Sequence, residues 1–272
     1  MRKDGTLVKD IDLFTLLIPF IMDKTYDAQN LVKQEIDPDP IRQFISLHRN
    51  LIPSLTHLSV LVYAYLASLK KHPQLNRFVV NSRLYQRNSI SVSFVTLKRG
   101  ADKTNEQTVV KIKFSEDDDL TSVSNKIHDE IEKNINSLYS NNTDALMKAV
   151  AKFSFLVRPI VAVIKWLDKH SLLPQSIIEA SPFHTSLFIT NLYSIRTNYI
   201  YHHLYEFGTT GVFVAMGKPE KKLMKAGDEI VEKKHIPLGI TLDERICSGH
   251  EFAMFFTDMN RYLSNPGLLL AD

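Results

Sequence analysis

The stretch LDERICSG, residues 242–249, decides the fold, because it joins the last predicted strand of the chain to the last predicted helix. Before it, HIPLGITLDE (235–244) is apolar enough for a buried strand. After it, residues 249–262 have the apolar spacing of an amphipathic helix. The turn between them gathers two acids, an arginine and the one cysteine of the chain, Cys247. Any chemistry at this end of the chain is therefore expected at this turn.

The other predicted strands are apolar, or alternate apolar and polar residues, and are bounded by turn residues. They lie at 30–36, 77–80, 83–86, 89–97, 108–114, 184–192 and 210–217. A polar, charged link joins the last of these to the strand that precedes LDERICSG.

The predicted helices carry apolar residues three or four positions apart, or start at a recognisable signal such as Pro40 in DPDP. They lie at 11–22, from 40 onward, at 55–71, 115–136, 145–168 and 249–262. The first of them, IDLFTLLIPFIM, is short and is interrupted by Pro19. It is expected to pack as a helix against the core, because it is too short to cross a membrane.

This order of elements predicts an α+β fold in which helices cover a mixed, largely antiparallel sheet. With 272 residues the chain is long enough for one substantial core, and we find no internal repeat and no low-complexity linker. One domain is therefore expected over residues 1–272, with residues 1–50 as an N-terminal extension that packs on it.

The composition excludes several classes of function. A net charge of +3 is too weak to indicate a nucleic-acid partner, since such binders carry concentrated basic patches. The N-terminus is polar and has neither the apolar core nor the cleavage site of a signal peptide. A single cysteine excludes an internal disulfide and fits a reducing compartment. A cytoplasmic protein is expected.

Residues 145–168, ALMKAVAKFSFLVRPIVAVIKWLD, are the most hydrophobic helical stretch. Four basic residues interrupt it, so a membrane-spanning helix is not expected, and Pro159 predicts a kink. The main interpretation is a core or interface helix whose lysines reach solvent. The minor interpretation is a helix that lies on a membrane surface, where basic residues accompany Phe, Leu and Trp.

Three separated stretches resemble the catalytic domain of the dihydrolipoamide acyltransferases of 2-oxoacid dehydrogenase complexes, which share a fold with chloramphenicol acetyltransferase. YLASLKKHPQLNRFVV (65–80) is similar to the family's helix that ends in K-x-x-P-x-L-N before a strand. SLFITNLYS (186–194) and GVFVAMGK (211–218) are similar to F-T-I-S-N-L-G and the apolar strand after it. LGITLDERICSG (238–249), with its helix and N-P-x-x-L, is similar to L-S-L-D-H-R-x-x-D-G. Their order and spacing cover roughly residues 50–270 and imply the same fold here.

The resemblance implies a chemistry that depends on one histidine. In the family this histidine is the general base: it takes the proton from the thiol of coenzyme A or of a dihydrolipoyl group, and the sulfur then attacks an acyl carbonyl. This chain has Glu244 at that position. A solvated carboxylate, with a pKa of ~4.3, is a weaker base than an imidazole at ~6.5, so Glu244 could serve only if burial raised its pKa. Ser248 replaces the family's aspartate, which holds the loop through an ion pair, while Asp243, Arg245 and Gly249 keep the shape of the motif.

A second feature of the family is better kept. The hydroxyl of F-T-I-S-N, which hydrogen-bonds the tetrahedral oxyanion, aligns with Thr190, and such a donor contributes ~3 kcal/mol to transition-state stabilisation. Asn191 matches the asparagine that follows. The alternative interpretation is that Thr190 is simply a β-branched strand residue.

Several residues are candidates to replace the missing base. His202 and His203, in YHHLYEFG, fall where the family has a loop near its active-site channel, and His203 is the preferred one. His250 follows the motif directly, and Cys247 could act as a nucleophile, although a small apolar side chain commonly packs at such a turn. His170 and His184 have no constellation around them in the sequence. No set of residues shows metal-ligand spacing, so no metal is expected.

The acyltransferase-like region fills almost the whole chain, so neither a lipoyl domain nor a subunit-binding domain is expected. The resemblance implies a homotrimer with the active site between subunits, as in the antibiotic acetyltransferases. The leading hypothesis is a stand-alone acyltransferase that uses coenzyme A or acyl-coenzyme A as co-substrate and a small-molecule acceptor. Glu244 or His203 would be the base and Thr190 the oxyanion donor. The second hypothesis is a non-catalytic trimeric binding or assembly protein that kept the fold and lost the histidine.

Overall fold

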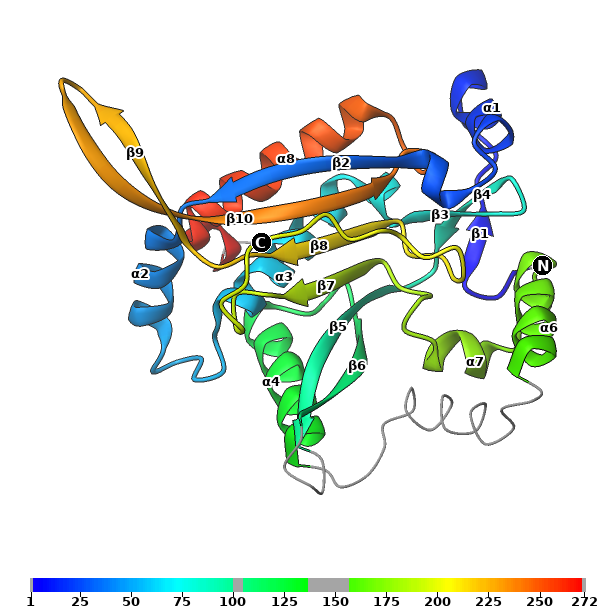
Figure 1. The fold of residues 1–272 in the computed structure, drawn as a ribbon, viewed down its shortest axis with the longest axis horizontal. Coiled ribbons are helices and arrows are strands. Elements are labelled where there is room, and N and C mark those ends of the chain that lie inside the picture. Colours follow the sequence, from blue (N-terminus) through cyan, green and yellow to red (C-terminus); the bar gives the residue numbers. More distant parts are fainter. Residues whose placement is uncertain (1, 100–104, 137–156, 271–272) are drawn as a thin grey trace.

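In the computed structural model, which describes residues 2–99, 105–136 and 157–270, a mixed sheet forms the centre of the molecule (Figure 1). Its strand order is β2-β10-β8-β7-β5-β6, with β9 paired to β10. β7 pairs in parallel with β5 and β8, and the other pairs are antiparallel. The strands are β2 (Gln29–Ile36), β5 (Ile90–Arg99), β6 (Asn105–Phe114), β7 (Leu187–Asn191), β8 (Val212–Met216), β9 (Glu220–Ala226) and β10 (Glu229–Asp243).

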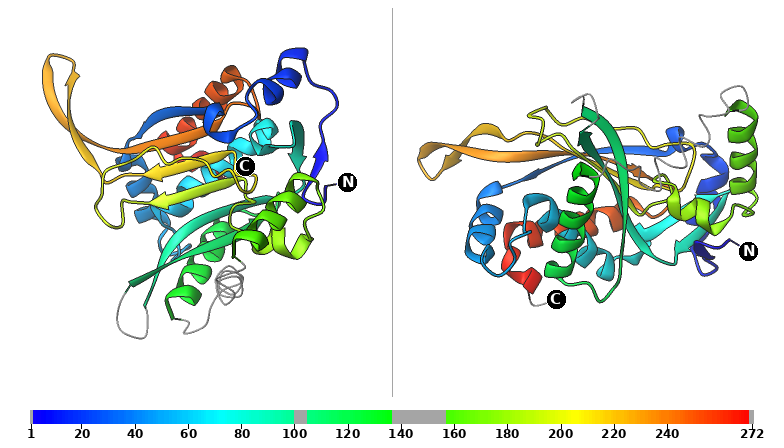
Figure 2. Two further views of the ribbon diagram at one scale, coloured as in Figure 1. Left: turned by 45° about the vertical axis from the view of Figure 1, so that its right-hand side comes forward. Right: turned by 90° about the horizontal axis from the view of Figure 1, so that it is seen from below.

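The segment before the last predicted strand differs from its prediction. The sequence predicts a polar, charged link there, but β9 and the first half of β10 form a two-stranded ribbon. Figures 1 and 2 show this ribbon extending away from the rest of the sheet. Lysines and acids occupy most of its positions, because neither face of the ribbon is covered within the described chain, and this hides the alternation that marks other strands.

A small second sheet lies beside the main one and has the order β1-β4-β3. Its strands are β1 (Gly5–Leu7), β3 (Arg77–Val80) and β4 (Arg83–Arg87). The predicted pair around Asn81 and Ser82 is confirmed, and these two residues have φ of 51° and 55°. Positive φ at both central positions is the geometry of a tight hairpin turn whose twist matches that of its strands.

Four helices pack against the main sheet or against one another on one face: α2 (Pro38–His48), α3 (His57–Lys71), α4 (Leu120–Asn136) and α8 (Gly249–Ser264) (Figure 2). α3 is the centre of this layer. Every residue from Leu58 to Leu69 is buried, so the helix is covered on all sides, by the sheet, α4 and α8. A capping box of Thr56 and Ser59 starts the helix, and Pro73 follows its end, as the sequence predicts.

The helix predicted at 11–22 forms as α1 (Leu13–Ile21), but the prediction that it packs against the core is wrong. Only Ile18 and Pro19 are buried, while Phe14 and Ile21 are each 71% exposed. Asp12 caps its start through the backbone N–H of Thr15. The apolar pattern correctly predicted the helix, but it carries no information about which surface covers it.

The hydrophobic stretch at 145–168 is described only from residue 157 onward, as α6 (Val157–Lys169), so the kink predicted at Pro159 falls at the edge of the described residues. α6 and the short α7 (Gln175–Ala180) precede β7. No helix in the described part of the chain is long and apolar enough to cross a membrane. The predicted fold class, α+β with a mixed, largely antiparallel sheet covered by helices, is confirmed.

Candidate functional site

The turn at 242–249 is held by a buried ion pair. Arg245 donates from Nε to Asp243 Oδ1 at 2.8 Å and from Nη2 to Asp243 Oδ2 at 2.7 Å, a two-point contact. The same guanidinium donates to Met22 O and Thr25 Oγ1, at 3.3 and 3.1 Å, in the segment after α1. Burial opposes the charge of Arg245, but the hydrogen bonds to Asp243 raise its pKa above the ordinary value. Asp243 and Arg245 therefore have a structural role that fixes the turn.

Ser248 begins α8. Its hydroxyl accepts from the backbone N–H of Glu251, and its own N–H donates to Glu251 Oε2 at 2.7 Å, which together form a capping box. A side chain at Gly249 would meet no described atom within 4 Å, so the glycine is not required by space. The serine therefore supports the turn by starting the helix, without the ion pair that the resemblance implies for an aspartate.

Cys247 lies inside this turn and is 2% exposed. Burial raises the pKa of its thiol above the ordinary value. A reactive cysteine needs a lowered pKa and access to solvent. The structure therefore agrees with the small buried side chain expected from sequence and gives no support to a nucleophilic thiol.

Glu244 faces solvent between two buried residues of the turn. Its backbone N–H donates to Ala28 O at 2.8 Å, which ties it to the start of β2, while the side chain is exposed. Asp243 on one side and Arg245 on the other are buried. The turn therefore holds Glu244 at the surface of the described chain.

Thr190 and Asn191 are the last two residues of β7, in the second of the three stretches that resemble the acyltransferases. Thr190 is half-buried, and no hydrogen bond of its hydroxyl is found in the part of the chain that the structure describes. Asn191 turns the chain, because its Oδ1 accepts from Ser194 N and its carbonyl accepts from the Ser194 hydroxyl at 2.7 Å. Thr190 thus keeps a hydroxyl free to donate to a bound group.

The sheet register separates Thr190 from Glu244. Thr190 pairs with Ala215, and Ala215 pairs with Gly239 on β10. Glu244 lies five residues beyond Gly239, so the two side chains are about 16 Å apart along the strands and about 10 Å apart across two strand spacings. One acyl carbonyl cannot contact both residues within a single chain.

The loop after β7 crosses the sheet face from the Thr190 end to the Glu244 end. It passes so close to the strands that a Cβ on Gly217 would lie 2.5 Å from Tyr199 N, and one on Gly239 would lie 2.1 Å from Ile200 O. Glycine is required at both places, because the neighbouring atoms belong to the backbone. The loop is therefore fixed on the sheet and delivers its histidines to a defined place.

His202 and His203 differ in environment. His202 stacks on Phe213 with ring centroids 4.0 Å apart, and burial lowers its pKa below the ordinary value. His203 is exposed, and the next residue, Leu204, donates from its N–H to Gln29 Oε1 at 3.3 Å. Since Gln29 pairs with Asp243, His203 reaches the surface at the same end of β10 as Glu244.

A groove of about 420 Å³ adjoins the turn, between β2 and α8. Leu242 and Gly249, which border the turn, belong to its lining. Apolar side chains cover much of it, and it also contains the amides of Asn30, Gln34 and Asn260, of which Asn260 donates to Gln34 Oε1 at 3.0 Å. It can accept an extended chain that alternates methylene and amide groups.

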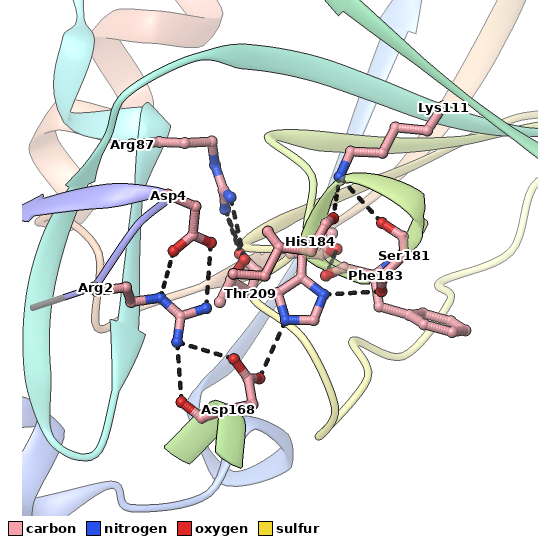
Figure 3. Close-up of polar contacts among 11 residues, drawn as sticks. Arg2, Asp4, Arg87, Lys111, Asp168, Ser181, Phe183, His184 and Thr209 are labelled. Carbon is pink, nitrogen blue, oxygen red and sulfur yellow. Dashed lines mark hydrogen bonds and ion pairs between the residues drawn. The ribbon is translucent and has the colours of Figure 1, made fainter. Parts of the chain in front are cut away.

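A second polar cluster, which the sequence did not indicate, surrounds His184 (Figure 3). His184 is 2% exposed; its Nε2 lies 3.1 Å from Asp168 Oδ2 and its Nδ1 lies 2.8 Å from Ser181 Oγ. Arg2 joins Asp168 at 2.9 Å and Asp4 at 2.6 Å. The expectation that His184 has no constellation is therefore wrong. Its partners come from distant parts of the chain, which no sequence spacing reveals.

This cluster is closed to solvent. Burial lowers the pKa of His184 below the ordinary value, although the hydrogen bond to Asp168 opposes the shift. Burial opposes the charge of Asp168, but the hydrogen bond and charge of His184, with Arg2, hold its pKa below the usual range. Ser181 is 2% exposed, so the serine, histidine and aspartate cannot meet a substrate. They join the chain start to α6 and to the loop before β7.

Two cations extend the cluster. Arg87 donates to Thr209 O at 2.7 Å, and burial lowers its pKa to about 10. Lys111 donates to Ile178 O and Ser181 O, at 2.9 and 3.1 Å, and burial lowers its pKa to about 7. Both hold backbone carbonyls near the α7 segment. Within the described residues, no group of three histidines, cysteines or acids could hold a metal ion.

Comparison with known proteins agrees with the motif set. The family model of the 2-oxoacid dehydrogenases acyltransferase (catalytic domain) matches residues 208–271, which include β8, the β9–β10 ribbon, the turn and α8. No curated protein matches the sequence of this chain.

Solved structures share the fold over nearly the whole chain. Dihydrolipoamide acetyltransferase from Azotobacter vinelandii has a TM-score of 0.60 at 14% identity and covers 97% of this chain and 94% of its own. A probable dihydrolipoamide acetyltransferase from Listeria monocytogenes 4b F2365 has a TM-score of 0.59 at 13% identity, over 95% and 94%. A chloramphenicol acetyltransferase has a TM-score of 0.55 at 11% identity, over 97% and 100%. The chain thus has the fold of these acyltransferases, and the resemblance predicted from its three motifs is confirmed.

Proposed function

We propose that this protein is a stand-alone acyltransferase that uses coenzyme A or its acyl thioester as co-substrate and a small-molecule acceptor. Its active site would form between copies of the chain, with Glu244 or His203 of one copy as base and Thr190 of another as oxyanion donor. The chain would be a single acyltransferase-like domain, and a homotrimer is the assembly that the fold favours.

One observation carries this proposal: the geometry of the turn. The buried pair of Asp243 and Arg245 fixes the backbone, and Glu244 between them is turned outward. His203 reaches the surface at the same end of β10. A fixed backbone that presents two proton-accepting side chains to solvent is suited to meet a reactant held by a second copy.

The reaction would balance as follows. The base takes the proton from the acceptor nucleophile, which attacks the thioester carbonyl, and the Thr190 hydroxyl donates to the oxyanion that forms. The tetrahedral intermediate then releases the thiolate of coenzyme A, which receives the proton from the base. In the reverse reaction, the same base takes the proton from the thiol of coenzyme A.

Two features support an active site that forms between two copies of the chain. Thr190 and Glu244 of one chain lie too far apart to act on one carbonyl, by the register of β7, β8 and β10. The β9–β10 ribbon exposes Leu223 and Ile230, each 74% exposed, and a two-stranded ribbon is only marginally stable alone. A neighbouring copy would cover the ribbon and could desolvate Glu244, which raises the pKa of a carboxyl group.

The groove between β2 and α8 suits the pantetheine arm of coenzyme A. That arm alternates methylene and amide groups, and the groove offers apolar walls with Asn30, Gln34 and Asn260. No lysine or arginine is among the lining residues, so the phosphates of the ligand would lie outside this groove.

Calorimetry with coenzyme A and acetyl-coenzyme A tests the proposal first, followed by acyl transfer with variants. Loss of a general base lowers kcat by ~100- to 10,000-fold, so either Glu244→Gln or His203→Ala should show such a loss. Thr190→Val keeps the β-branched shape and should lower kcat ~100-fold or more. Glu232→Gln and His128→Ala, which change an exposed acid and histidine elsewhere, are the matched controls.

Mixing two inactive variants tests the shared site. Subunits carrying Glu244→Gln or His203→Ala, whichever is inactive, are refolded together with Thr190→Val subunits. Some interfaces then contain both intact residues, and activity should return in part. If the mixed assemblies recover no activity, while wild-type subunits refolded in the same way are fully active, the base and the oxyanion donor are not shared between copies as proposed.

A non-catalytic assembly protein is the second candidate. The exposed Glu244 and the capping role of Ser248 favour it, because both substitutions leave the fold of the turn intact without the family's histidine. An assembled protein that binds neither coenzyme A nor acetyl-coenzyme A in calorimetry would support this function and contradict the first.

A further inference from the structure

α1 exposes its apolar side chains instead of burying them. Its exposed residues are Leu13, Phe14, Leu16, Leu17, Phe20 and Ile21. At 100° per residue these six occupy an arc of about 160°, and Thr15, Ile18 and Pro19 fill the arc that faces the protein. A surface helix ordinarily turns its apolar side inward, so α1 is oriented for contact with something outside the chain.

α6 carries a different exposed surface. Arg158, Lys165 and Lys169 are exposed and fall within about 40° of one another around the helix. Trp166, 55% exposed, and Val161 flank this cationic stripe. The one acid of the helix, Asp168, is buried with Arg2 and His184, so the outer face of the described helix has only positive charge.

The polar cluster of Figure 3 fixes these two helices at one end of the molecule. Asp168 of α6 pairs with Arg2, which lies three residues before β1, and β1 pairs with β4. α1 also contacts β4. Figures 1 and 2 show α1 and α6 at the same end, together with the N-terminus. The two helices that carry the apolar arc and the cationic stripe are thus held at one end of the molecule.

We propose that this end of the molecule, formed by α1 and α6, binds the surface of a membrane that contains anionic lipid. α1 would insert its apolar arc among the acyl chains near the headgroups, and the cations of α6 would meet the lipid phosphates. Trp166 would lie at the headgroup level, where indole rings are favoured. This inference does not depend on acyl transfer.

A bilayer fits both surfaces at once. It offers apolar chains to α1 and negative charge to α6, whereas another protein surface would need an apolar groove and an acidic patch at matching places. The charges around α1 itself are mixed, since Lys9 and Lys24 accompany Asp10, Asp12 and Asp23. Electrostatic attraction therefore comes from α6, and α1 contributes apolar contact.

The single tryptophan of the chain makes the test direct, because Trp166 lies in the proposed contact. The full chain is mixed with vesicles of phosphatidylcholine alone or with added phosphatidylglycerol, at low and high salt. We expect co-sedimentation and a blue shift of Trp166 emission with the anionic vesicles, both reduced by salt. Protein that stays in the supernatant with unchanged emission in all conditions would overturn the proposal.

Variants separate the contributions of the two helices. Phe14→Ser with Phe20→Ser should weaken vesicle binding at least ~tenfold, because two exposed aromatic rings no longer insert. The matched control is Leu47→Ser with Leu51→Ser, which removes similarly exposed apolar groups at and just after the end of α2 and should leave binding unchanged. Equal losses in both pairs would contradict a specific contact through α1.

Charge reversal tests α6 in the same way. Lys165→Glu with Lys169→Glu should weaken binding to anionic vesicles ~tenfold or more, while Lys70→Glu with Lys133→Glu, exposed lysines on α3 and α4, should not. Light scattering without vesicles tests the alternative that a second copy of the chain covers the apolar arc of α1. If the α1 variants dissociate an oligomer and the wild type binds no vesicles, the surface joins copies of the chain and the membrane proposal is wrong.

Discussion

Two buried ionic groups hold this fold, and they are built differently. Asp243 and Arg245 are two residues apart and form a closed pair at the strand-to-helix turn. Arg2 and Asp168 are 166 positions apart and join a cluster in which Arg2 contacts two carboxylates and Asp168 contacts a histidine. The first group fixes one turn, which Arg245 also ties to the segment after α1, and the second fixes α6 to the residues before β1. Loss of one member should therefore have different effects in the two places.

The closed pair should be the more sensitive. Arg245→Ala leaves the carboxylate of Asp243, itself 4% exposed, with no cation, so the free energy of unfolding should fall by ~3–5 kcal/mol. Arg245→Lys keeps the charge and loses the two-point contact, so it should fall between this variant and the wild type. Urea denaturation followed by circular dichroism measures both. A change below ~1 kcal/mol for Arg245→Ala would show that Asp243 finds another partner.

The cluster around Arg2 and Asp168 should tolerate the loss of one charged side chain better than the pair of Asp243 and Arg245 does. Asp4→Ala leaves Arg2 paired with Asp168, so the expected cost is ~2 kcal/mol. A double-mutant cycle of Asp4→Ala with Arg2→Ala isolates their interaction free energy. If Asp4→Ala costs as much as Arg245→Ala under the same conditions, the shared cluster offers no compensation.

Only the cluster should respond to pH near neutrality. Burial lowers the pKa of His184 in the folded chain, so the unfolded chain binds a proton first as the pH falls below ~6.5. Stability is thus fully present above that pH and is lost as the pH falls toward the folded pKa, by at most ~1.4 kcal/mol per pH unit from this group. His184→Gln should reduce this slope below pH ~6.5, where His57 and His202, whose pKa values burial also lowers, still contribute, whereas Arg245→Lys should keep the slope of the wild type. Parallel slopes for His184→Gln and the wild type would exclude His184 as the source.

The smallest effect is expected beside the closed pair, at the start of α8. Ser248→Ala removes the side-chain acceptor of the capping box and should cost ~1 kcal/mol. Ser248→Asn keeps an acceptor and should stay within ~0.5 kcal/mol of the wild type. Thermal unfolding of the three proteins measures this, and an equal loss in both variants would mean that the hydroxyl acts in another way.

The difference between the two groups also marks the limit of prediction from sequence. Asp243, Arg245 and Ser248 lie within one motif, so the sequence places them together. His184, Asp168 and Arg2 meet only after the chain has folded, and no local pattern predicts their contact. The apolar and alternating patterns predicted most of the sheet, because its strands have one or both faces covered, as in β2 and β8. The β9–β10 ribbon was missed for the opposite reason, since both of its faces are uncovered.

The candidate site shows the same limit at a finer level. The motifs locate Thr190 and Glu244, but their separation follows from the pairing of β7, β8 and β10, which sequence alone does not predict. Likewise the spacing of α1 predicted its helix, while its exposed arc depends on neighbours that the pattern does not identify. The geometry of the candidate site and the chemistry of the surface therefore needed the fold, whereas the motifs needed only the sequence.

The burial of Cys247 has a practical consequence for the turn. Because the chain has no other cysteine, a thiol reagent can modify the native protein only when this turn opens. The rate of labelling, compared with that of the unfolded chain, then gives the local opening free energy at the start of α8. Labelling with and without coenzyme A would report directly whether the ligand closes the turn, with no engineered probe and no knowledge of the acceptor.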